Sequence, residues 1–191
     1  MKQRKMTINL VWANVFAAIF CFAILLLSSA AWYFVWGFPT FEEFPMQFLP
    51  NHNPLLTSLI VFVALMAGIV VHELIHGLTW AYFAKKGFKS IRFGIFWEML
   101  TPYCHCSEPL TVRQYCIGAL MPLVVLGVIP LALAYPLKSI LLLGWGVLFV
   151  AAAAGDILIV WKIRKEPAEN MVLDHPKEAG CMFLEEDYRI R

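Results

Sequence analysis

Four apolar stretches dominate this chain of 191 residues, and each is long enough to cross a lipid bilayer as a helix. They cover residues 10–36, 55–84, 114–135 and 139–161. A membrane-spanning helix needs about 20 consecutive, mostly apolar residues, since every backbone polar group must be paired within the hydrocarbon. Only 15% of the residues are charged, whereas soluble domains average about 25%. The sequence therefore predicts an all-α polytopic membrane protein with four transmembrane helices.

Positive charges are concentrated on one side of these predicted helices. Of the 15 lysines and arginines, 14 lie in the N-terminus, in the loop 85–113 or after residue 161. The other two loops hold only Lys138. Because basic loops stay in the cytoplasm, this distribution predicts that both termini are cytoplasmic. It also accounts for the net charge of +2, so we expect the lipid bilayer, and no nucleic acid, beside the basic residues.

The loop 85–113 has a pattern that the other loops lack. Residues 91–99 include apolar side chains at every second position, which is typical of a β-strand. A second, shorter strand at 103–107 would complete a small cytoplasmic β-hairpin between the second and third helices. We expect residues 1–161 to form a single membrane-embedded domain. Residues 162–191 are polar and are expected to form a partly ordered cytoplasmic tail.

Residues 72–76, inside the second apolar stretch, read His-Glu-Leu-Ile-His. Residues four apart share one face of a helix, so His72 and His76 can bind the same ion. Imidazole nitrogens suit Zn²⁺, and Glu73 is then placed to act as the general base of a hydrolytic reaction. Each charged group near the middle of a bilayer costs roughly 2.5–3.5 kcal/mol, so polar residues at this place indicate a function. The alternative is a buried polar cluster that holds helices together.

A zinc site of this kind needs a third protein ligand, and Asp156 is the first candidate. It is the only acid besides Glu73 within the predicted helices. With a rise of about 1.5 Å per residue, Asp156 lies about 9 Å from the cytoplasmic end of its helix and His76 about 13 Å from that end of its own. Gly155 would allow the two helices to approach closely. Alternatively, Asp156 is structural and the third ligand lies outside the helices, where three residues are available: His105, Glu108 and His175.

The five cysteines do not suggest a disulfide framework. Cys104 and Cys106 flank His105, and the three side chains resemble a set of metal ligands. A C-x-C pair is a weak indication on its own, so we expect an ordinary loop there.

Three stretches resemble families of zinc peptidases. They read VVHELIHGLTW at 70–80, AAGDILIV at 153–160 and VLDHPKEAGC at 172–181. An HExxH helix, a hairpin, a helix and an Asp-bearing helix, in this order, resemble the core of the site-2 proteases, which are intramembrane zinc metalloproteases. Ile157 follows the aspartate where those proteases usually have glycine. More narrowly, the three stretches resemble the bacterial DUF3267 family of zincin peptidases.

The resemblance implies that His72, His76 and Asp156 bind Zn²⁺ and that Glu73 is the general base. It further implies a zinc metalloendopeptidase of the bacterial inner (cytoplasmic) membrane. Its partner would be a membrane-embedded or membrane-adjacent protein substrate. Two other functions are compatible with the same residues: an intramembrane metal transporter and a catalytically inactive membrane scaffold.

Overall fold

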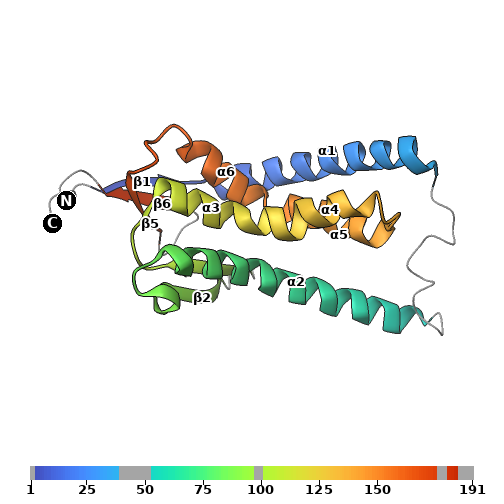
Figure 1. Cartoon of the computed structure of the whole chain (residues 1–191), viewed down its shortest axis with the longest axis horizontal. Helices are drawn as coiled ribbons and strands as arrows, with labels where there is room; N and C mark the ends of the chain where they lie inside the picture. Colours follow the sequence, from blue (N-terminus) through green and yellow to red (C-terminus); the bar gives the residue numbers. More distant parts are fainter. Residues whose placement is uncertain (1–2, 39–52, 97–100, 176–179, 185–191) are drawn as a thin grey trace.

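Long apolar helices form most of the protein (Figure 1). The computed structural model describes residues 3–38, 53–96, 101–175 and 180–184. Helix α1 spans Leu10–Trp36 and helix α2 spans Pro54–Phe83. Asn9 and Asn53 precede these helices, and the side-chain oxygen of each accepts hydrogen bonds from two backbone N–H groups of the first turn. Asparagine caps at both starts explain why the helices begin at these residues.

A third long helix is assembled from three consecutive segments. These are α3 (Val112–Pro122), the π-helical segment η4 (Leu123–Val128) and α4 (Ile129–Ala134). The π-helical turns begin directly after Pro122, whose ring lacks the N–H that a regular α-helix would use. Within the described residues, α1, α2 and this third helix are long and apolar enough to cross a membrane, which indicates a membrane protein.

The fourth predicted helix is not continuous. Within the stretch 139–161, the structure has α5 (Ile140–Ala152) and α6 (Ala154–Ile163), which are bent by 44° at Ala153. Neither helix is long enough by itself, and the pair forms either a broken span or a re-entrant element. The predicted set of four transmembrane helices is therefore wrong. Ala153 is fully buried, and its small side chain allows the chain to turn inside the packed interior.

The all-α class is also wrong, because six strands form two antiparallel sheets within the described residues. The smaller sheet is the predicted hairpin, which consists of β2 (Ile91–Phe96) and β3 (Thr101–Cys106). Residues 97–99, which we also expected in the first strand, lie outside the described residues. A short 3₁₀ helix, η3 (Gly87–Ser90), connects α2 to this hairpin.

The larger sheet joins both ends of the chain. Its order is β1-β6-β5-β4, and the strands are β1 (Gln3–Thr7), β6 (Gly180–Leu184), β5 (Met171–Asp174) and β4 (Leu110–Thr111). Pairing of β1 with β6 places the N-terminal and C-terminal strands side by side at one end of the molecule (Figure 1). The tail that we expected to be partly ordered therefore contributes two strands to this sheet.

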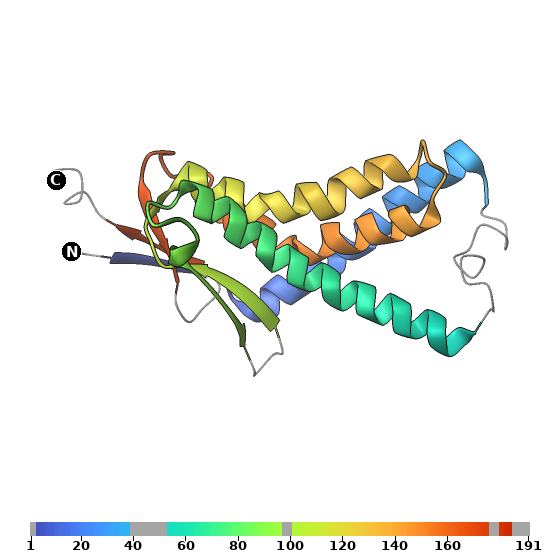
Figure 2. The ribbon, with the colours of Figure 1, turned by 60° about the horizontal axis from the view of Figure 1, so that its bottom comes forward.

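Both sheets lie at the same end of the helices, and α2 diverges from α1, α4 and α5 toward the other end (Figure 2). Buried side chains gather where α2, α3 and the two sheets meet. This core includes Trp80, Ile91, Leu110, Tyr115, Val172 and Phe183. The candidate site lies on α2 next to this core, so the sheets and the site share a packed environment.

Candidate metal centre

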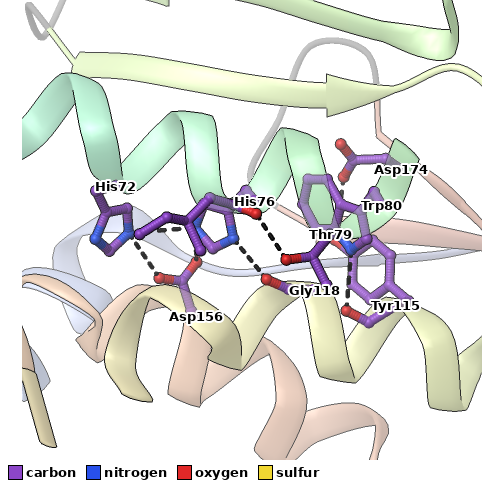
Figure 3. A network of polar contacts seen from close by, with 9 residues as sticks. His72, His76, Thr79, Trp80, Tyr115, Gly118, Asp156 and Asp174 are labelled. Carbon is purple, nitrogen blue, oxygen red and sulfur yellow. Dashed lines mark hydrogen bonds and ion pairs between the residues drawn. The ribbon is translucent and has the colours of Figure 1, made fainter. Parts of the chain in front are cut away.

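His72, His76 and Asp156 converge on one point (Figure 3). The Nε2 atoms of the two histidines are 3.2 Å apart. The Asp156 Oδ2 atom lies 3.3 Å from His72 Nε2, and its Oδ1 atom lies 3.5 Å from His76 Nε2. Only 8% of His72 and 4% of His76 is exposed. The structure therefore brings together the three residues that the sequence suggested as ligands.

Two helices position these side chains. Because α2 is a regular helix through this region, His72 and His76 project from the same face, one turn apart. Asp156 lies in the first turn of α6, just after the bend at Ala153. The bend therefore directs the start of α6, and its carboxylate, toward α2.

The spacing of the three groups fits a tetrahedral zinc site. Bonds from Zn²⁺ to nitrogen and oxygen ligands measure about 2.0–2.2 Å, so two ligand atoms of a tetrahedron lie about 3.4 Å apart. The two histidine nitrogens are 3.2 Å apart. One Asp156 oxygen lies 3.3 Å from His72 Nε2, and the other lies 3.5 Å from His76 Nε2. With one ligand atom taken from each residue, the three atoms lie within 4.8 Å of one another. Imidazole nitrogens and a carboxylate are also ligand types that Zn²⁺ binds. These residues therefore fit the ion in both chemistry and distance.

The tautomer of His76 is defined by a contact with α3. Its Nδ1–H donates to the Gly118 carbonyl oxygen over 2.9 Å, which leaves the lone pair of Nε2 directed at the candidate centre. The His76 ring also stacks on Trp80, with 5.3 Å between the ring centroids. Among the described residues, the buried Nδ1 atom of His72 has no hydrogen-bond partner. One histidine is thus oriented by hydrogen bonding and the other by packing, with Phe149 stacked near it.

Glu73 lies between this cluster and the hairpin. Its half-buried carboxylate faces the backbone N–H of Cys104 in β3. Gly77 allows the hairpin to approach α2, because a Cβ atom there would lie 2.7 Å from the Phe93 ring and 3.2 Å from Cys104 Sγ. The hairpin therefore packs directly beside the residue expected to act as the base.

Comparison with protein families identifies the chain. Residues 65–171 match the DUF3267 family, which is described as "Putative zincin peptidase". The match covers more than half of the chain and includes His72, His76 and Asp156. The chain belongs to this family. No curated protein and no solved structure matches it. Zincins are zinc peptidases, so membership implies a zinc metallopeptidase and confirms the narrower of the two resemblances.

The other suggested ligands of this zincin-family chain lie elsewhere. His105 contacts Asp174, with 3.1 Å between Nδ1 and Oδ2. The Glu108 carboxylate accepts a hydrogen bond from the Lys86 backbone N–H over 3.3 Å. The backbone of His175 is held within the tail by the carbonyl of Gly180. Among the described residues, only His72, His76 and Asp156 have the spacing of a metal-binding group.

Among the described residues, Cys104, His105 and Cys106 do not have the spacing of a metal-binding group. Cys104 and Cys106 are buried in the core, and burial raises the pKa of both thiols. A raised pKa keeps a thiol protonated at neutral pH. The two cysteines thus pack against the core that the hairpin shares with α2 and α3.

Gly155 does not have the predicted role. It is exposed, and a Cβ atom added to it would meet no atom within 4 Å. The close approach occurs instead at Gly118, where an added Cβ would lie 2.0 Å from Trp80 Nε1. The backbones that approach closely at this site are therefore those of α2 and α3. Helix α6 contacts α2 here through the side chain of Asp156.

Four residues that support the site were not found from the sequence: Trp80, Tyr115, Gly118 and Asp174. Their contacts join segments that lie far apart in the chain, so no local pattern reveals them. Two stretches singled out in the sequence do contain such residues: VVHELIHGLTW ends on Trp80, and VLDHPKEAGC includes Asp174.

Proposed function

We propose that this chain is a membrane-embedded zinc metalloendopeptidase of the site-2-protease type, which hydrolyses a peptide bond in or near the bilayer. The observation that carries the proposal is the zinc-like spacing of His72, His76 and Asp156 beside Glu73. These histidines lie on a helix that is long and apolar enough to cross a membrane. Membership of a zincin family supports the same chemistry.

The residues divide the reaction between them. His72, His76 and Asp156 would hold Zn²⁺, which supplies a Lewis acid and makes water a nucleophile at neutral pH. Glu73 accepts the proton of the attacking water and then passes it to the leaving amine. The Cys104 backbone N–H lies beside the Glu73 carboxylate.

The substrate in this proposal is a protein segment in the membrane or next to it. A helical substrate would have to unwind locally, because its backbone carbonyls are hydrogen-bonded within the helix. We place the protein in the bacterial inner membrane with both termini in the cytoplasm. The distribution of basic residues supports this orientation, and the pairing of β1 with β6 supports a common side for both termini.

Replacing the base separates peptidase activity from metal binding. In Glu73→Gln the amide cannot accept a proton, so hydrolysis should fall by about 10²- to 10⁴-fold while zinc is retained. New protein N-termini in membranes of expressing cells can be counted by mass spectrometry, with zinc measured on the purified variant. Glu169→Gln, which changes an exposed carboxylate outside the site, is the matched control and should behave as wild type.

Each rival function predicts a different result for Glu73→Gln. An inactive scaffold gives the same N-termini in wild type, in the variant and in cells without the protein. A metal transporter changes the cellular zinc content equally in wild type and variant. Either pattern would reject the peptidase.

A further inference from the structure

Asp174 lies in the tail motif VLDHPKEAGC, which has no part in the proposed chemistry. It is the last residue of β5, and only 12% of its side chain is exposed. Its Oδ1 atom accepts a hydrogen bond from the Tyr115 hydroxyl over 3.0 Å. Its Oδ2 atom accepts from His105 Nδ1 over 3.1 Å and from the Cys106 backbone N–H over 3.4 Å. One carboxylate thus joins the tail to α3 and to β3.

The contact with α3 continues to a candidate metal ligand (Figure 3). The buried Tyr115 ring stacks on Trp80, with 5.3 Å between centroids, and Trp80 stacks in the same way on His76. The Trp80 Nε1–H donates to the Tyr115 carbonyl over 3.2 Å. One turn further along α3, Gly118 accepts the hydrogen bond of His76. Because Tyr115 and Gly118 lie one turn apart on α3, a shift of Tyr115 would also move the Gly118 carbonyl oxygen relative to His76.

The contact with β3 continues to the candidate base. His105 and Cys106 directly follow Cys104, whose backbone N–H faces Glu73. Backbone N–H groups two residues apart along a strand, such as those of Cys104 and Cys106, point to the same edge. The carboxylate of Asp174 can therefore fix the edge of β3 from which the Cys104 N–H reaches Glu73 on α2.

We propose that Asp174 is a positioning residue, through which the C-terminal sheet holds α3 against His76 and β3 against Glu73. This inference rests on the proposed metal centre. It adds that the geometry of this centre depends on the C-terminal tail, in which Asp174 lies. Asp174 touches none of His72, His76 and Asp156, and it lies beyond the residues 65–171 that define the family match. A merely structural salt bridge would stabilise the sheet without changing the properties of a bound metal.

Cobalt substitution tests this proposal without a known substrate. The full-length protein in detergent is titrated with Co²⁺, and the dissociation constant and the visible ligand-field spectrum are recorded. Direct partners of metal ligands typically contribute about 10- to 100-fold to affinity. Asp174 acts one step further away, so Asp174→Asn should weaken Co²⁺ binding by about 3- to 10-fold and shift the spectrum.

Three further variants distinguish positioning from simple loss of stability. Tyr115→Phe removes only the hydroxyl and should change affinity and spectrum in the same direction as Asp174→Asn. Asp174→Glu restores the carboxylate and should recover part of both. Glu166→Gln removes another tail carboxylate, which pairs with Arg4 away from this network, and should match wild type.

The outcomes are separable. Wild-type Co²⁺ affinity and spectrum in Asp174→Asn would overturn the inference and leave the metal centre intact. If Asp174→Asn does not fold, Tyr115→Phe decides, and wild-type behaviour of that variant likewise overturns the inference. Absence of Co²⁺ binding by the wild-type protein would overturn both the metal centre and the role of Asp174.

Discussion

Gly118 connects a backbone position to the geometry of the metal centre. Its carbonyl accepts the His76 Nδ1–H, and its missing side chain leaves the space that the Trp80 indole fills. Trp80 is 5% exposed and is held between His76 and Tyr115, so the indole has little freedom to move. Any side chain at position 118 must therefore displace α3 from α2.

Gly118→Ala should weaken both the fold and the site. Overpacking of a core typically costs about 1–3 kcal/mol, so the free energy of unfolding should fall by about that amount. Loss of the hydrogen bond that orients His76 should reduce zinc affinity by about tenfold. Thermal unfolding and competition with a chelator measure the two effects on the purified protein.

Gly155→Ala is the matched control, because it makes the same substitution one residue from Asp156. Its Cβ would meet no atom within 4 Å, so zinc affinity should not change. Alanine is favoured over glycine within a helix by up to about 1 kcal/mol, and stability should stay the same or rise slightly. Equal losses in both glycine variants would contradict the packing described for α2 and α3.

Among the secondary-structure elements, those that depend on local pattern were predicted correctly. His72 and His76 lie on the same face because α2 is helical. The length of the apolar stretch was enough to predict that helix. The hairpin of β2 and β3 likewise follows from alternation of side chains along 91–96. Asp156 could be proposed because acids are rare within membrane helices, although its contact with the histidines is tertiary.

The bend between α5 and α6 could not be predicted from hydropathy. The chain stays apolar through Ala153, and neither proline nor glycine occupies the position of the bend. Hydropathy reports the length of an apolar stretch and carries no information on whether the helix continues through it. Packing of Ala153 and Ala154, which are fully buried, decides the direction of the chain here.

The four-stranded sheet was missed for a different reason. β1 and β6 come from opposite ends of the chain, and both are short strands. Strands of about five residues near charged termini give little periodic signal, and their pairing is entirely non-local. The role of Asp174 depends on this sheet, so it could not be derived from the sequence either.

For the whole molecule, the proposed orientation can be tested by labelling in spheroplasts. Phe38, beyond the end of α1, is 82% exposed, and Lys165, after α6, is also exposed. With the N-terminus in the cytoplasm, Phe38→Cys should react with a membrane-impermeant maleimide in intact spheroplasts. Lys165→Cys should react only after permeabilisation. Each is compared with the parent chain, since five native cysteines are present. Labelling of Lys165→Cys, but not of Phe38→Cys, in intact spheroplasts would contradict the proposed orientation.

The central claim is that this chain holds zinc within its membrane helices through His72, His76 and Asp156. The most direct test is the zinc content per chain of detergent-purified protein, measured for wild type, His72→Ala and Asp156→Ala. The account predicts about one zinc per wild-type chain and loss of that zinc in both variants. Zinc retained in Asp156→Ala would contradict its assignment as the third ligand. A wild-type protein that contains no zinc, even after reconstitution with the ion, would contradict the metal centre itself.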